Sequence, residues 1–191
     1  MSGAQIGGLG ALAGALLGGG GGAARGAVGG GAMAVLGTLA LTALQNAAAS
    51  RSGASTAQLA PRAPSTQEVA AVASDDGERL VLRAMIAAAK ADGHIAQDEM
   101  QRILGHLKAD EVSESERRFV LDEINKPLDV ADIAREVRTP AQAAEVYAAS
   151  LVAIDIDSDA EREYLRSLSS ALGLDPGVIA FLHQTTGAPT V

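Results

Sequence analysis

The sequence of 191 residues predicts an all-α protein, because three features recur along residues 75–191. Apolar residues are spaced three and four apart there, which places them on one face of a helix. Each apolar run follows a residue type that caps helix N-termini, and each ends at glycine, proline or a charged loop. No stretch alternates polar and apolar residues as a half-buried strand does. We therefore expect a helical bundle without a β-sheet.

Caps and apolar faces place seven helices in this part of the chain. The spacing predicts them at about residues 76–91, 97–108, 114–126, 129–138, 139–154, 158–172 and 175–187. Asp75 with Glu78, and Ser158 with Glu161, have the spacing of a capping box, which marks a helix start. Pro140 has the first-position placement that helices tolerate, since its missing amide hydrogen would be unbonded there.

Charge and glycine content divide the chain into two parts. Residues 1–74 have a net charge of +2, whereas residues 75–191 carry 12 basic and 22 acidic side chains, net −10. Sixteen of the 22 glycines precede residue 55, so the first part can bury little apolar surface per residue. We expect residues 75–187 to form an acidic all-α domain that holds the core. Residues 51–74, rich in Ser, Ala and Pro, are typical of a linker.

Residues 1–50 form a Gly/Ala-rich, low-complexity segment whose single charged side chain is Arg25. From Gly10 to Gly30 a glycine recurs every fourth residue, which on a helix makes a small face that allows close helix packing. The 25 uncharged residues between Arg25 and Arg51 exceed the roughly 20 that span a bilayer. These features predict a membrane helix at about residues 27–48. The alternatives are a flexible tail and a self-associating segment.

Composition also excludes several classes of function. The absence of cysteine removes disulfides and thiolate zinc sites. The net charge of residues 75–191 and the four aromatic residues disfavour nucleic-acid binding, while cations or basic partners fit the acidic field. No HExxH, GxSxG or phosphate-binding loop is present, so we expect no catalytic residues and no enzyme activity.

Two helix–loop–helix joints, residues 87–104 and 149–165, resemble each other and carry clustered carboxylates. The candidate metal ligands are Asp92, Asp98, Glu99, Asp155, Asp157 and Glu161. Three of them lie in predicted first turns, where negative charge complements the helix dipole. Asp92, Asp155 and Asp157 instead follow predicted helix C-termini, where negative charge is disfavoured, and so indicate a bound Ca²⁺ or Mg²⁺. Capping and turn formation remain the alternative for the whole set.

These joints are similar to the signature of the TerB-like tellurite-resistance family, A-x-A-D-G-x-I-x-x-x-E followed by a second acidic loop. Residues 89–99 match the first part and residues 153–165 the second. The Gly-rich N-terminus resembles the inner-membrane, YebE-like branch, grouped as domain of unknown function 533. The resemblance implies a seven-helix bundle of bacterial origin, with a divalent-cation site between the acidic loops and no established enzyme activity.

The combined hypothesis is a membrane-associated interaction or metal-sensing module of a bacterial envelope or stress-response system. It would bind a divalent cation or a basic partner through the two acidic joints and meet membrane lipid through its N-terminus. The slight charge bias around the membrane helix favours an inner-membrane protein with a cytoplasmic acidic domain. The alternatives are a self-associating scaffold without metal, which forms a homo-oligomer through the glycine face, and a metal-dependent hydrolase.

Overall fold

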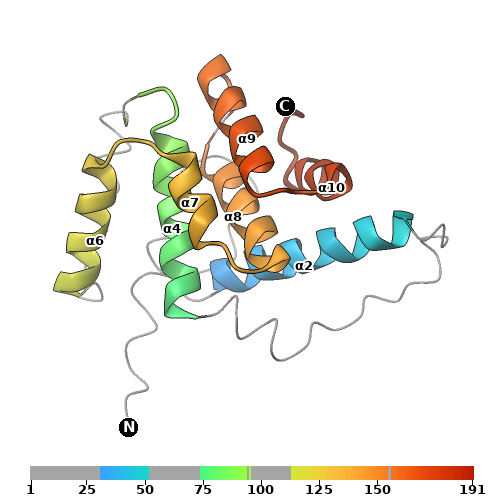
Figure 1. The fold of residues 1–191 in the computed structure, drawn as a ribbon, viewed down its shortest axis with the longest axis horizontal. Helices are drawn as coiled ribbons and strands as arrows, with labels where there is room; N and C mark the ends of the chain where they lie inside the picture. Colours follow the sequence, from blue (N-terminus) through green and yellow to red (C-terminus); the bar gives the residue numbers. More distant parts are fainter. Residues whose placement is uncertain (1–30, 52–73, 94, 96–112, 155) are drawn as a thin grey trace, which may run out of the picture.

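A computed structural model describes residues 31–51, 74–93, 95, 113–154 and 156–191. These residues form seven helices and no strand, which confirms the all-α prediction (Figure 1). The helices are α2 (Gly31–Arg51), α4 (Asp75–Ala89), α6 (Glu114–Asn125), α7 (Val130–Glu136), α8 (Pro140–Ala153), α9 (Asp159–Ala171) and α10 (Pro176–Thr186). The helix predicted at about residues 97–108 lies outside the described residues.

The two central helices, α4 and α8, lie side by side and run in the same direction (Figure 1). The Ser150 hydroxyl of α8 donates a hydrogen bond to the Ala84 carbonyl of α4 over 3.4 Å. Ser150 is ten residues beyond the start of α8, and Ala84 is nine beyond the start of α4. The helices are therefore nearly in register, and their N-termini share one end of the bundle.

Most helix starts follow the predicted capping chemistry. The capping boxes of α6 and α9 are both present, and proline occupies the first turn of α8 and of α10. The start of α4 differs from the prediction, because Ser74 and not Asp75 is the cap. The Ser74 hydroxyl accepts a hydrogen bond from the Gly77 amide over 3.1 Å. Glu78, the expected capping partner, is buried, with only 8% of its surface exposed.

The core extends beyond the acidic part of the chain, because α2 packs against α8 and α10. Its buried residues in the core are Leu36, Ala40, Ala43 and Ala47. An ideal Cβ placed on Gly177 of α10 would lie 3.5 Å from the Ala47 Cβ, so the two backbones approach closely. Small residues on both helices permit this approach. The core therefore includes residues of α2 as well as the residues 75–187 in which the sequence predicted it.

The predicted membrane helix corresponds to α2, and the structure does not support that prediction. Among the described residues, no helix combines the length and the apolar character needed to cross a membrane. α2 is uncharged from Val35 to Ser50, but it carries threonines, glutamine and asparagine among its apolar residues. Most of its apolar side chains face the bundle, whereas Val35, Thr38 and Thr42 are exposed. Low charge thus reflects packing against other helices in this conformation.

Two buried polar contacts connect α9 and α10 to the central helices α4 and α8. The Tyr164 hydroxyl of α9 donates to the Ala84 carbonyl over 3.2 Å. The Tyr147 hydroxyl of α8 lies 2.9 Å from His183 Nε2 of α10. Burial raises the pKa of Tyr147 to about 12, so its hydroxyl keeps its proton at neutral pH. Each contact satisfies a polar group that the core would otherwise leave unpaired.

Candidate functional site

The described parts of the two acidic joints, residues 87–93 and 149–165 without 155, lie at the same end of the bundle, where α4 ends and α9 begins (Figure 1). The hydrogen bond between Tyr164 and Ala84 fixes this arrangement. Ala84 lies five residues before the last residue of α4, and Tyr164 lies five residues after the first residue of α9. Because α4 and α9 run in opposite directions, the end of α4 and the start of α9 lie at the same end of the bundle. We call this region the acidic end.

Three of the six predicted ligands can be placed at the acidic end. Asp92 follows α4 and is exposed, and Asp157 is exposed in the loop before α9. Glu161 occupies the first turn of α9. Asp98, Glu99 and Asp155 lie outside the described residues. Among the residues that the structure describes, no group of three or more metal-ligating side chains comes together.

Glu161 has a structural role at the start of α9. Its Oε2 atom accepts hydrogen bonds from the Ser158 amide, the Ser158 hydroxyl and the Asp157 amide at 2.9 Å, 2.9 Å and 3.0 Å. This is the capping alternative predicted from the sequence, and it accounts for the position of Glu161 without a metal. The metal-binding role of the six residues stays a prediction.

Lys90 shows that positive charge is already bound at this end. It caps α4, and its Nζ atom donates to the Glu123 carbonyl over 2.9 Å and to the Lys126 carbonyl, both in the last turn of α6 or just after it. The C-terminal carbonyls of a helix carry partial negative charge, so an ammonium group is favoured there. Burial, assisted by the charge of Lys126 and opposed by that of Glu123, lowers the pKa of Lys90.

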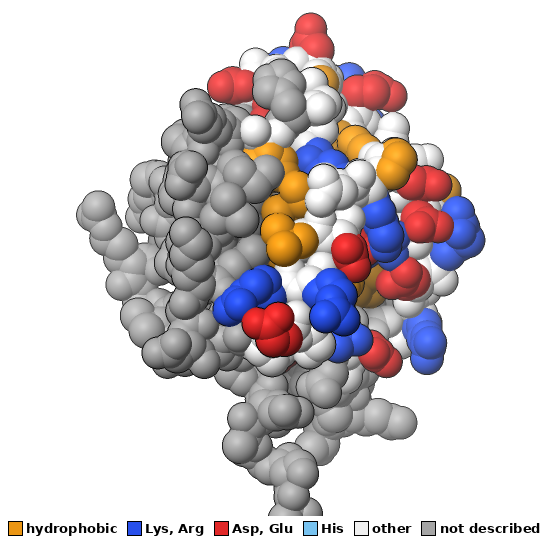
Figure 2. Space-filling model, turned by 90° about the vertical axis from the view of Figure 1, so that its left-hand side faces the viewer, with side chains coloured by type: hydrophobic (Ala, Val, Ile, Leu, Met, Phe, Trp, Pro, Cys, Tyr) orange, Lys and Arg blue, Asp and Glu red, His pale blue; other side chains and the backbone are white. Residues whose placement is uncertain are grey.

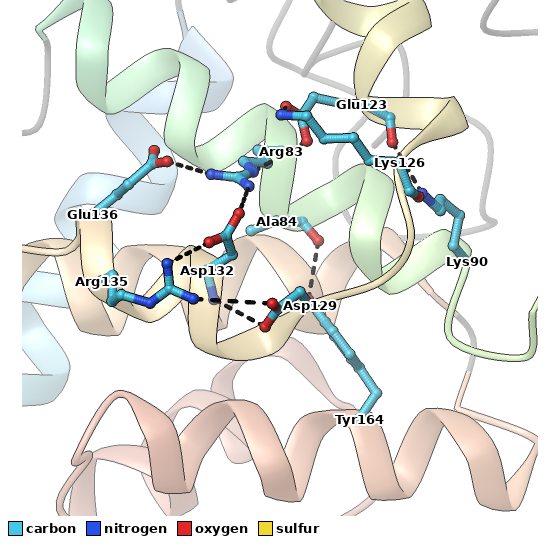
Figure 3. Close-up of polar contacts among 10 residues, drawn as sticks. All are labelled: Arg83, Ala84, Lys90, Glu123, Lys126, Asp129, Asp132, Arg135, Glu136 and Tyr164. Atoms are coloured by element: carbon cyan, nitrogen blue, oxygen red, sulfur yellow. Dashed lines mark hydrogen bonds and ion pairs between the residues drawn. The ribbon is translucent and has the colours of Figure 1, made fainter.

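The most connected buried charge is Arg83, in the middle of α4 (Figure 3). Its guanidinium donates from Nε to Glu123 over 3.1 Å, from a terminal nitrogen to Asp132 over 2.9 Å, and from the other to Glu136. These four residues, which we call the Arg83 junction, join α4 to α6 and α7. Sequence analysis missed the junction because its partners lie 40 to 53 residues from Arg83.

The junction stabilises the ionised forms of Arg83 and Asp132. Burial by itself lowers the pKa of the Arg83 guanidinium, but the hydrogen bond to Asp132 and the charges of Glu123 and Glu136 outweigh it, so the net pKa is raised. The hydrogen bond from Arg83 is also the main cause of the lowered pKa of Asp132. A buried arginine with several carboxylate partners is typical of a structural connection between helices.

A groove of about 750 Å³ lies beside the junction. It is lined by Ser74, Asp76, Arg79, Leu80, Arg83, Phe119, Asp122, Glu123, Lys126, Arg135, Glu136, Arg138, Thr139 and Gln142. Five of these side chains are basic and four are acidic. Figure 2 shows the same mixture on this side of the molecule, with Lys and Arg interleaved with Asp and Glu. The groove therefore has no charge of one sign that would select a ligand.

A second buried charge site contrasts with the junction. Glu145 of α8 is 1% exposed, and its Oε1 atom has no hydrogen-bond partner. Burial, followed by the nearby charge of Glu78, raises the pKa of Glu145 to about 8. The signal for both sites is present in the sequence. Arg83 and Glu145 each interrupt an apolar stretch, LVLRAMIAAA and AQAAEVYAAS respectively, at a position where a charge needs an explanation.

Comparison with known proteins places this arrangement in a family. The sequence model of DUF533, proteins of unknown function, matches residues 1–186. The chain belongs to the DUF533 family. A protein of Yersinia enterocolitica described as "Uncharacterized protein in ampR 5'region" is 36% identical over 107 residues, which cover 56% of this chain and 76% of the relative. No solved structure matches the chain.

Proposed function

We propose that this DUF533 protein is a TerB-like, non-enzymatic interaction module of a bacterial envelope or stress-response system. In this proposal the acidic end binds a divalent cation or a basic partner. The observation that carries it is the position of Asp92 and Asp157, which are both exposed and lie on loops at the same end of the bundle. Carboxylates from two loops at one end can converge on a single cation or on one basic surface.

The directions of the helices also favour a positive ligand at the acidic end. α4 and α8 both finish there, and the hydrogen bonds of Lys90 bring the end of α6 beside them. The partial negative charge of helix C-termini adds to that of the carboxylates, so the local field favours positive ligands. The overall charge of residues 75–191, net −10, acts in the same direction.

Membrane association is the second part of the proposal. No side chain between Arg25 and Arg51 is charged, and this stretch contains most of α2. The absence of charge supports membrane association. An uncharged helix can approach the interfacial region of a bilayer without removing charges from water. We propose an inner-membrane location with the acidic end in the cytoplasm, as the charge bias of the sequence favours.

Calorimetric titration of the full-length protein with Ca²⁺ and with Mg²⁺ tests the cation. We expect saturable binding of at least one ion, and a loss of affinity of about tenfold or more in Asp92→Asn/Asp157→Asn. Asp122→Asn, an exposed carboxylate on α6, is the matched control and should bind as the wild type does. Equal affinities in the double variant and the control would exclude a role for these two carboxylates.

Membrane association has a separate test. Cells expressing the full-length protein are fractionated, and the membranes are washed with sodium carbonate. We expect the protein to sediment with membranes before the wash, and any fraction that survives the wash to be integrally inserted. A protein found entirely in the soluble fraction before washing would contradict membrane association and leave the cation proposal unaffected.

A further inference from the structure

Glu145 lies on α8, the helix that packs against both α2 and α4. Ala141, one turn earlier on the same face of α8, packs against Leu41 of α2. On the side of α4, the carboxyl group of Glu78 interacts electrostatically with Glu145. Glu145 is almost fully buried, and Glu78 is 8% exposed. Two acidic side chains are therefore enclosed at the interface that holds α2 on the bundle.

The described surroundings of Glu145 contain no charge that would stabilise its ionised form. α2 carries no charged side chain from Val35 to Ser50, and Glu145 forms no salt bridge. On α10 the nearest titratable group, His183, is bonded to Tyr147, and on α9 Tyr164 is bonded to Ser150 and Ala84. Glu78 is an acid and opposes ionisation of Glu145. The geometry thus suits the protonated carboxyl and penalises the carboxylate.

We propose that Glu145 is a proton-dependent latch for α2: the protonated side chain permits α2 to pack on α8, and loss of the proton favours release of α2. Release exposes the Glu145 carboxylate to water and removes it from the neighbourhood of Glu78. It also exposes the apolar residues of α2. The further step, in which released α2 binds lipid, rests on the proposed membrane association.

The direction of the pH effect follows from the two states. In the packed state the pKa of Glu145 is raised to about 8, whereas an exposed glutamate has its ordinary value of 4.5. Packing of α2 is therefore strongest below pH 4.5 and weakens as the pH rises towards 8. Within this window the equilibrium for release increases by about tenfold per pH unit, and above it the equilibrium levels off.

Hydrogen–deuterium exchange of the full-length protein tests the latch. Exchange of α2 amides is measured at pH 5.5, 6.5 and 7.5 in the wild type and in Glu145→Gln. Their ratio at each pH cancels the intrinsic pH dependence of amide exchange. We expect the ratio of wild-type to variant exchange to rise by about tenfold per pH unit in α2. We also expect wild-type α2 to exchange faster than α9, which packs on α4, α7 and α8, because release of one helix requires less free energy than unfolding of the whole protein. Glu163→Gln, an exposed carboxylate on α9, is the control and should show a constant ratio in both helices.

Two results would overturn the latch. A constant ratio in α2 would show that ionisation of Glu145 does not control this helix. Exchange in α2 that is no faster than exchange in α9 at any of these pH values would show that α2 opens only when the whole protein unfolds and is not released by itself. Glu78→Gln provides an independent variant, because removing the neighbouring charge should reduce α2 exchange at pH 7.5.

Lipid binding is measured in a separate experiment. The same proteins are sedimented with vesicles of phosphatidylethanolamine and phosphatidylglycerol at pH 5.5 and 7.5. We expect more wild-type protein to bind at the higher pH, and Glu145→Gln to lose this difference. If α2 exchange follows the latch but no protein binds vesicles, the latch stands and the proposed membrane association is wrong.

Discussion

Arg83 and Glu145 are both charged residue types in the interior of this protein, but their surroundings differ. Arg83, which is 8% exposed, contacts carboxylates from α6 and α7. Glu145, which is 1% exposed, has an unpaired oxygen and another acid beside it. Burial penalises both charges, and only Arg83 has partners that offset the penalty. The outcome is a permanently ionised connection at one site and a carboxyl group that is neutral below about pH 8 at the other.

The two sites also connect different kinds of structure. The Arg83 junction joins α4 to the short helix α7 and to α6, whose buried residues include Val120 and Glu123. Glu145 lies among alanines, where α8 packs against α2 and α4. Where few apolar side chains are available, ion pairs define the contact. Where small apolar side chains pack closely, an isolated carboxyl group makes the contact sensitive to pH.

The largest expected effect is that of Arg83→Met, which removes the guanidinium and retains much of its apolar length. Glu123 would then remain buried with Lys126 as its remaining ionic partner, so we expect a loss of about 3 kcal/mol in the free energy of unfolding, the lower end of the cost of breaking a buried pair. Urea denaturation at pH 7 measures it. Arg79→Met on the same helix is the control, because Arg79 is exposed and stacks over Phe119 at 5.9 Å. Similar losses in the two variants would contradict the importance of the junction.

Glu145→Gln should instead increase the free energy of unfolding. In the wild type, the free energy of unfolding should fall by about 1.4 kcal/mol per pH unit between pH 4.5 and 8 because of this group. The amide cannot ionise, so we expect the variant to be more stable at pH 8. The gain should be on the order of 2 kcal/mol, less than the roughly 5 kcal/mol that this slope implies, because a buried amide without hydrogen-bond partners is itself unfavourable. Denaturation at a series of pH values checks both points. Parallel pH profiles for the wild type and the variant would show that Glu145 is not the group responsible.

Tyr164→Phe should have a smaller effect, because the group removed is neutral. The variant loses the hydrogen bonds of the Tyr164 hydroxyl to the Ala84 carbonyl and the Ser150 hydroxyl. The Ser150 hydroxyl can still donate to the Ala84 carbonyl. We expect a loss of about 1 kcal/mol, measured by thermal or urea denaturation. A loss as large as that of Arg83→Met would mean that burial alone, and not charge, decides the cost at these sites.

Asp132→Asn tests the exposed side of the junction, and here we expect the smallest change. The pKa of Asp132 is lowered, chiefly by the hydrogen bond from Arg83, so its contribution is present at neutral pH and is lost as the pH falls below the ordinary value of 3.8. The variant should therefore be slightly less stable than the wild type at pH 7, and its stability should decrease less steeply in acid, so that the two proteins converge at low pH. An unchanged acid profile would indicate that Asp132 does not contribute to the junction.

Local sequence signals predicted the helices accurately where they depend on neighbours along the chain. Ser158 and Glu161 have the spacing of a capping box, and proline at the start of α8 and α10 is compatible with a helix. The core faces of α4 and α9 also follow from their spacing. α2 was misinterpreted for a physical reason: an uncharged, small-residue stretch has the same composition whether it packs against lipid or against alanines of its own chain.

The candidate sites divide in the same way. The clustering of acids into two matching joints is visible in the sequence, and the fold brings Asp92 and Asp157 to one end because α4 and α9 run in opposite directions. Glu161 was correctly expected to have capping as an alternative role. The buried charges are different, since a sequence shows that Arg83 and Glu145 interrupt apolar runs but does not show what faces them.

The sequence by itself determined the all-α class, the limits of most described helices, and the division between a nearly neutral first part and a strongly acidic second part. Those properties depend on side chains within one or two turns of each other. Only the tertiary structure decided that α2 belongs to the core and that Arg83 contacts three carboxylates. It also decided that Glu145 has no basic partner among the described residues and lies near a second acid, Glu78. The ionisation of a buried group depends on its neighbours in space, and these come from helices far apart along the chain.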